Sequence, residues 1–152
     1  MSDSTPATGA DQEILITRIF DAPRERVFKA WTDPDEVAAW YGPAHMEVPR
    51  DTVRIDARVG GRWEVTMVPR GGGDGFAIGY EIVELVEPEL LVMRSDPMPG
   101  QPEPTVVRVQ LHDHGLKTRM TLSDGPFPAA GRGHAEAGYA SALDELAAHL
   151  AA

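Results

Sequence analysis

Two histidines separated by one residue are the first feature of the chain that could do chemistry. His112 and His114 flank Asp113, and imidazole and carboxylate groups are common transition-metal ligands. Spacing places no third and fourth ligand beside them, and the following Gly115 predicts that residues 112–115 turn the chain. We therefore expect a solvated turn and no bound zinc, iron or copper, which elemental analysis of protein purified without a histidine tag would check.

Titratable side chains near predicted helix starts are a second candidate for a catalytic site. His134 and Glu136 lie near the start of the last helix, and Asp33, Asp35 and Glu36 gather at the start of an earlier one. The helix dipole favours carboxylates in a first turn, so a structural role explains both groups. No pair of carboxylates is placed for acid–base catalysis.

Known catalytic motifs are absent from the sequence. The glycine-rich segment 71–75 lacks the lysine and the Ser/Thr of a phosphate-binding loop, and it joins two predicted strands, so we expect a hairpin. GxSxG, HExxH and the dinucleotide fingerprint are missing. Zero cysteines exclude thiolate catalysis and cysteine-ligated metals. The residues give no positive support for an enzyme, and we expect no cofactor.

The first part of the chain predicts a strand followed by two short helices. Residues 14–20 are rich in β-branched and aromatic side chains, which favour a strand. Pro23 can occupy the first turn of a helix whose apolar face carries Val27 and Trp31. A second start signal precedes a short helix over 35–41, which ends at a Gly-Pro pair.

The middle of the chain predicts antiparallel strands joined by turns, and the end predicts a long helix. Apolar and polar residues alternate, as in a sheet with one wet and one covered face, over 46–55, 62–68, 76–86, 90–95, 105–113 and 116–123. Pro49 interrupts the first of these, which suggests an edge strand or a bulge. Residues 133–151 place Tyr139, Leu143, Leu146 and Leu150 at spacings of four, three and four, the stripe of a helix packed on a sheet.

Four blocks of sequence point to a known family. They are ILITRIFDAPRERVFKAWTDPDEVAAWYGP (14–43), DARVGGRW (56–63), ELVEPELLV (84–92) and HAEAGYASALD (134–144). With them the chain resembles the homologues of the activator of the heat-shock protein 90 ATPase, in the START-like (SRPBCC) helix-grip superfamily. The resemblance implies an α+β fold in which a curved antiparallel sheet wraps a long C-terminal helix and leaves a cavity. Tyr139 stands where family members usually have tryptophan, which adds a hydroxyl facing that pocket.

The implied cavity gives a set of candidate ligand-binding residues. They are large or flexible apolar side chains on inward faces, namely Trp40, Tyr41, Trp63, Met67, Met93, Val107, Val109, Met120, Tyr139 and Leu143. Such side chains suit the wall of an apolar cavity, and they equally suit a filled core. Glu84 adds a polar group only if Tyr80, Ile82 and Glu84 face inward; a solvated glutamate is the alternative.

The bulk properties predict one domain over residues 13–152, preceded by a disordered tail over 1–12. A chain of 152 residues can bury a sufficient core without staples. The chain has no long apolar run and its first residues are polar, so we expect a cytoplasmic location and no membrane insertion. The net charge of -10 argues against binding to nucleic acid and to anionic membrane surfaces.

Three functions remain open. The preferred one is a binding module for a hydrophobic or lipid-like small molecule in the helix-grip cavity. The second, suggested by the family name, is a co-chaperone-like interaction with another protein, or with a second copy of the chain. The third is a cyclase or hydrolase of the wider superfamily. A large enclosed pocket favours the first, an exposed apolar patch the second, and a polar cluster deep in the pocket the third.

Overall fold

The computed structural model describes residues 13–97 and 103–151. Residues 1–12, for which we predict a disordered tail, lie outside the described residues, as do residues 98–102 and 152.

A strand and two short helices open the fold, as the sequence predicts. They are β1 (Ile14–Phe20), α2 (Arg24–Thr32) and α3 (Pro34–Trp40). Asp33 separates the two helices, and its side chain accepts hydrogen bonds from the backbone N–H groups of Asp35, at 2.8 Å, and Glu36, at 3.4 Å. This is a helix N-cap, so the structural interpretation of these acids is confirmed.

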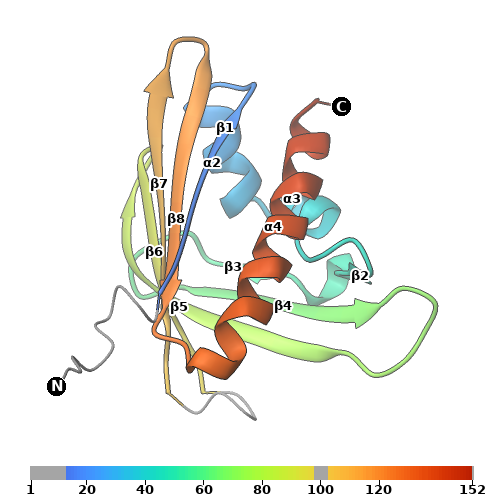
Figure 1. Cartoon of the computed structure of the whole chain (residues 1–152). Coiled ribbons are helices and arrows are strands. Elements are labelled where there is room, and N and C mark those ends of the chain that lie inside the picture. Colours follow the sequence, from blue (N-terminus) through green and yellow to red (C-terminus); the bar gives the residue numbers. More distant parts are fainter. Residues whose placement is uncertain (1–12, 98–102, 152) are drawn as a thin grey trace, which may run out of the picture.

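The remaining strands form one antiparallel sheet with β1 (Figure 1). They are β2 (Met46–Glu47), β3 (Arg54–Ile55), β4 (Arg62–Pro69), β5 (Phe76–Val86), β6 (Leu90–Ser95), β7 (Val106–His114) and β8 (Lys117–Gly125). The strand order is β1-β8-β7-β6-β5-β4-β2, and β3 also pairs with β4. The predicted hairpin at 71–75 is confirmed, because it joins β4 to β5.

Two predicted segments differ in the structure. Residues 46–55 do not form one strand: a single-turn helix, η1 (Arg50–Thr52), separates the two-residue strands β2 and β3, because Pro49 cannot donate to a ladder and instead precedes the turn. Residues 112–115 are not a turn either. His112 and His114 belong to β7, where His114 pairs with Lys117, and only Gly115 and Leu116 connect the strands.

The long helix α4 (Ala129–Ala151) lies on the concave face of the sheet (Figure 1). It begins four residues earlier than predicted, at Ala129 in place of Gly133. Leu143 and Leu146 are fully buried on its inner side. The α+β helix-grip prediction is therefore confirmed. No helix in the described part of the chain is long and apolar enough to cross a membrane.

Replacing Gly133 with alanine is expected to stabilise the protein by about 0.5–1 kcal/mol. Glycine in a helix interior costs roughly this much relative to alanine. A methyl group at Gly133 meets no atom within 4 Å. Chemical denaturation measures the change; an unchanged or lowered free energy of unfolding would show that the helix is not formed at this position.

Candidate functional site

Five aromatic rings form a continuous run from the short helices to the sheet. Trp31, Trp40, Tyr41, Trp63 and Tyr80 pack edge to face, with ring centroids 4.9 to 6.4 Å apart. The indole of Trp40 donates to the carbonyl of Ala30 at 2.7 Å, and that of Trp63 to the carbonyl of Trp31 at 2.9 Å. The indole N–H of Trp31 is buried and has no partner among the described residues.

A buried carboxyl group lies beyond the end of this run, under α4. Asp124 is 3% exposed, and its Oδ2 accepts a hydrogen bond of 2.6 Å from the Tyr139 hydroxyl. No hydrogen-bond partner of good geometry faces its Oδ1 within the described residues. No arginine, lysine or histidine in the described ranges forms an ion pair with Asp124. A buried carboxyl without a cation is costly for a folded protein.

Other hydroxyl groups surround this carboxyl. The Tyr80 hydroxyl interacts with those of Tyr41 and Tyr139, which links the aromatic run to Asp124. Thr105 and Ser95 are buried beside it, and the Thr105 backbone N–H donates to the Ser95 hydroxyl at 2.8 Å. These groups form a polar cluster in the interior, made of Tyr41, Tyr80, Ser95, Thr105, Asp124 and Tyr139.

Burial sets the protonation of this polar cluster. It raises the pKa of Asp124, against the opposing effect of the Tyr139 and Thr105 hydroxyls and the Gly125 N–H. Burial, reinforced by neighbouring negative charge, also raises the pKa of Tyr41, Tyr80 and Tyr139 above the ordinary value for tyrosine. The tyrosines are therefore neutral hydrogen-bonding groups at physiological pH, and Asp124 holds its proton to a higher pH than an exposed aspartate does.

The raised pKa of Asp124 predicts that it lowers stability as the pH rises. Above the unfolded-state pKa of about 3.9 the folded protein binds more protons than the unfolded chain, so unfolding becomes easier with rising pH until the folded-state pKa is passed. Asp124→Asn removes this dependence. The thermal midpoint of Asp124→Asn should rise relative to that of wild type as the pH increases above about 4. Asp74→Asn, in the exposed hairpin loop, is the control and should show no such rise. Parallel curves for wild type and Asp124→Asn would contradict the prediction.

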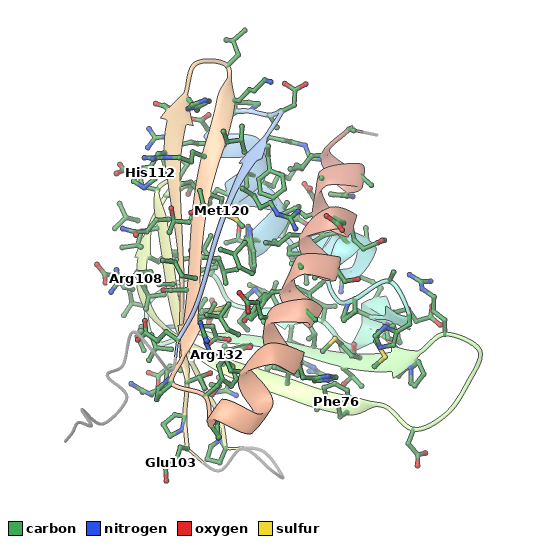
Figure 2. All side chains as sticks on the ribbon, in the orientation of Figure 1. Phe76, Glu103, Arg108, His112, Met120 and Arg132 are labelled. Atoms are coloured by element: carbon green, nitrogen blue, oxygen red, sulfur yellow. The ribbon has the colours of Figure 1, made fainter. Side chains whose placement is uncertain are left out.

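The ten predicted cavity residues all belong to one hydrophobic core cluster. Tyr41, Met67 and Tyr139 are partly buried, and the other seven are buried. Figure 2 shows Met120 on the side of the sheet that faces α4. Glu84 is exposed, because the register of β5 against β6 shifts between Ile82 and Glu84 and turns it outward. Its solvated interpretation is confirmed.

Four members of the polar cluster were not among the predicted site residues: Tyr80, Ser95, Thr105 and Asp124. The predicted strand ended at Ser123, two residues before the end of β8 at Gly125. The alternation of Met120 and Leu122 on the inward face of β8, continued by two residues, places Asp124 inward as well. Strand parity was therefore a usable signal. For Tyr80 the sequence did not show which face of the sheet it lies on, because the register shift between Ile82 and Glu84 interrupts the alternation of β5.

Two hollows lie outside the space between the sheet and α4. One of about 520 Å³ borders the outward residues of β4 and β5, including Arg62, which pairs with Asp96 and Glu64. A second of about 190 Å³ lies between the ends of β5, β6 and β7, where Val86, Leu90 and His112 line it. Neither hollow is lined by α4. Among the described residues no group of three or more His, Asp or Glu side chains could hold a metal ion.

Comparison with known proteins identifies the family. The family model described as Activator of Hsp90 ATPase homolog 1-like protein matches residues 21–151. A comparison with curated proteins gave no significant match.

Solved structures show the same fold. A protein from Chromobacterium violaceum is 25% identical with a TM-score of 0.80, over 90% of this chain and 95% of its own. An AHSA1 protein from Silicibacter pomeroyi is 23% identical with a TM-score of 0.80, over 91% and 97%. CalU16 from Micromonospora echinospora is 22% identical with a TM-score of 0.69, over 91% and 75%.

Proposed function

Because the chain belongs to the family of Activator of Hsp90 ATPase homolog 1-like proteins, we propose that it is a binding module that holds a largely apolar small molecule between the sheet and α4. Family membership and the helix-grip fold support a ligand-binding or co-chaperone-like module in general. The proposal goes further in assigning the ligand to the ten core residues predicted above, with Asp124 and Tyr139 as its polar anchor.

The buried Asp124 is the observation that carries the proposal. A carboxyl that is 3% exposed and lacks a cation destabilises a fold, and such costly groups occur most often at functional sites. Its Oδ1 and the Trp31 indole N–H are a buried acceptor and a buried donor that lack a hydrogen-bond partner of good geometry among the described residues. An apolar wall with a few polar groups is the usual composition of a small-molecule site. The ligand expected here is apolar, with a hydrogen-bond donor for Asp124.

Entry of the ligand needs movement in the core. Tyr41, Met67 and Tyr139 are the three predicted cavity residues that are only partly buried, so their side chains can move at the least cost. Tyr41 lies on the loop after α3, whose Ala44 N–H donates to the Ser141 hydroxyl of α4 at 3.0 Å. We place the entrance between this loop and the first half of α4.

A thermal-shift comparison tests the proposal with two probes, 1-aminoanthracene and anthracene. Both are apolar, and only the first carries a hydrogen-bond donor. A ligand that binds only the folded state raises the melting temperature, so both should stabilise the protein and 1-aminoanthracene more strongly. If neither compound raises the melting temperature while Tyr139→Ala costs roughly 3–5 kcal/mol, as in a solid core, the interior is filled and the proposal fails.

Acid–base catalysis is a second candidate, favoured by the same carboxyl. An aspartic acid whose pKa is raised by burial can exchange a proton with a bound molecule at a higher pH than an exposed aspartate can. Recovery of a bound compound distinguishes the two. Binding leaves the compound unchanged, whereas catalysis converts it, and Asp124→Asn then stops the conversion while the protein stays folded.

A further inference from the structure

The outer face of the sheet, on the side away from α4, carries an unusual distribution of charge. The outward residues of β1, β8 and β7 are Leu15, Thr17, Ile19, Lys117, Arg119, Thr121, Ser123, Val106, Arg108, Gln110, His112 and His114. None of them is acidic, although the chain has 24 acidic residues and a net charge of -10. The acidic residues within these strands alternate away from the outer face: Asp113, between His112 and His114, pairs with Arg24 at 3.0 Å, and Asp124, next to Ser123, is buried.

The cations on this face are free. Arg108 and Arg119 are exposed and form no ion pair or side-chain hydrogen bond with any described residue. By contrast, Arg94 on β6, the strand that neighbours β7, is bonded to Glu81 at 2.6 Å. Arg119 stands directly opposite His112 across the β7–β8 pair, so a second cationic group lies beside it when that histidine is protonated. Figure 2 shows Arg108 and His112 pointing away from α4.

Apolar side chains are interspersed with these cations. Leu15 is 65% exposed and Ile19 53% exposed, and Val106 is 42% exposed. The hollow of about 190 Å³ adjoins this face through Gln110 and His112. Its apolar wall is made of Val86, Leu90 and Leu111, and its remaining lining residues are Arg24 and Glu89. It is smaller than the usual small-molecule site of roughly 300–1,000 Å³, and is better suited to one apolar side chain of a partner.

We propose that this face docks a segment of another protein that presents acidic side chains interspersed with apolar ones. The free arginines attract the acids, and the hollow between β5, β6 and β7 accepts an apolar side chain. A nucleic acid fits less well, because the overall charge repels a phosphate backbone. A second copy of the chain fits less well, because its acidic residues lie outside this face. The face would then contact a different surface of the second copy, and such a head-to-tail contact does not form a closed two-fold dimer.

Peptide binding tests the proposal, with a twelve-residue peptide of alternating glutamate and leucine as the probe. Calorimetry should show binding that weakens with salt, and weaker binding of the matched Glu/Ser peptide. The double variant Arg108→Glu/Arg119→Glu should lose roughly tenfold or more in affinity, because two attractions become repulsions. Arg54→Glu/Arg58→Glu is the control. Arg54 is the first residue of β3 and Arg58 follows that strand. The control variant changes the net charge by the same amount as Arg108→Glu/Arg119→Glu.

Equal weakening by both double variants would overturn the proposal, since only overall charge would then matter. Absence of any binding to the Glu/Leu peptide would overturn it too. So would binding of duplex DNA or of phosphatidylserine vesicles that only Arg108→Glu/Arg119→Glu abolishes, or a dimer in sedimentation that this variant alone dissociates. Thermal midpoints of all variants, expected to lie close to wild type, show that folding is retained.

Discussion

Leu143→Ala is expected to lower the free energy of unfolding by about 2–5 kcal/mol, the usual cost of truncating a buried leucine. Leu143 is fully buried where α4 crosses the concave face of the sheet. Its methyl groups pack in the core cluster that also contains Trp63 and Met120, so removing them leaves a space that the rigid sheet cannot close.

Denaturation by urea measures this change, and Leu116→Ala is the matched control. Leu116 is 90% exposed at the tip of the β7–β8 hairpin, so its truncation should change stability by no more than about 0.5 kcal/mol. A loss for Leu143→Ala as small as that of the control would mean that α4 is not part of the core.

Gly61→Ala is the second large effect expected, a loss of roughly 1–3 kcal/mol or more. A methyl group at Gly61 would lie 2.0 Å from the carbonyl oxygen of Asp56 and 3.0 Å from that of Arg58. Neither atom can move away freely. The Gly61 N–H donates to the Arg58 carbonyl, and the Gly61 carbonyl accepts from the N–H of Ile82, both at 2.9 Å.

Gly133→Ala serves as the opposite control, because the same substitution at an open helical position is expected to stabilise the protein. Both variants are compared with wild type by chemical denaturation. If Gly61→Ala unfolds at the wild-type midpoint, the backbone around residues 56–62 does not approach as closely as the structure shows.

Much of the fold could be predicted because its signals are local. The apolar spacing in α4 and the alternation in β4 and β8 are set by each element's own period, so they can be counted in the sequence. Features that depend on how two segments of the chain pair could not be predicted from the sequence. The register shift that exposes Glu84 involves β5 and β6 together, and the close approach at Gly61 involves a segment that turns back onto β4.

The candidate site shows the same division. The sequence and the family resemblance identified the apolar residues and Tyr139, but not the partner of its hydroxyl. Asp124 was predictable from the parity of Met120 and Leu122, whereas its pairing with Tyr139 joins β8 to α4 and is visible only in three dimensions.

The most direct measurement of the central claim is the affinity of 1-aminoanthracene and of anthracene for wild type and for Asp124→Leu/Tyr139→Phe, followed by probe fluorescence. The double variant replaces both members of the buried polar pair with apolar groups, which can be neutral or stabilising for the fold. The account predicts that wild type prefers 1-aminoanthracene, and that the double variant stays folded, still binds anthracene and loses the preference. Equal affinities of both probes for wild type, or an unchanged preference in the double variant, would contradict Asp124 and Tyr139 as the polar anchor of a ligand site.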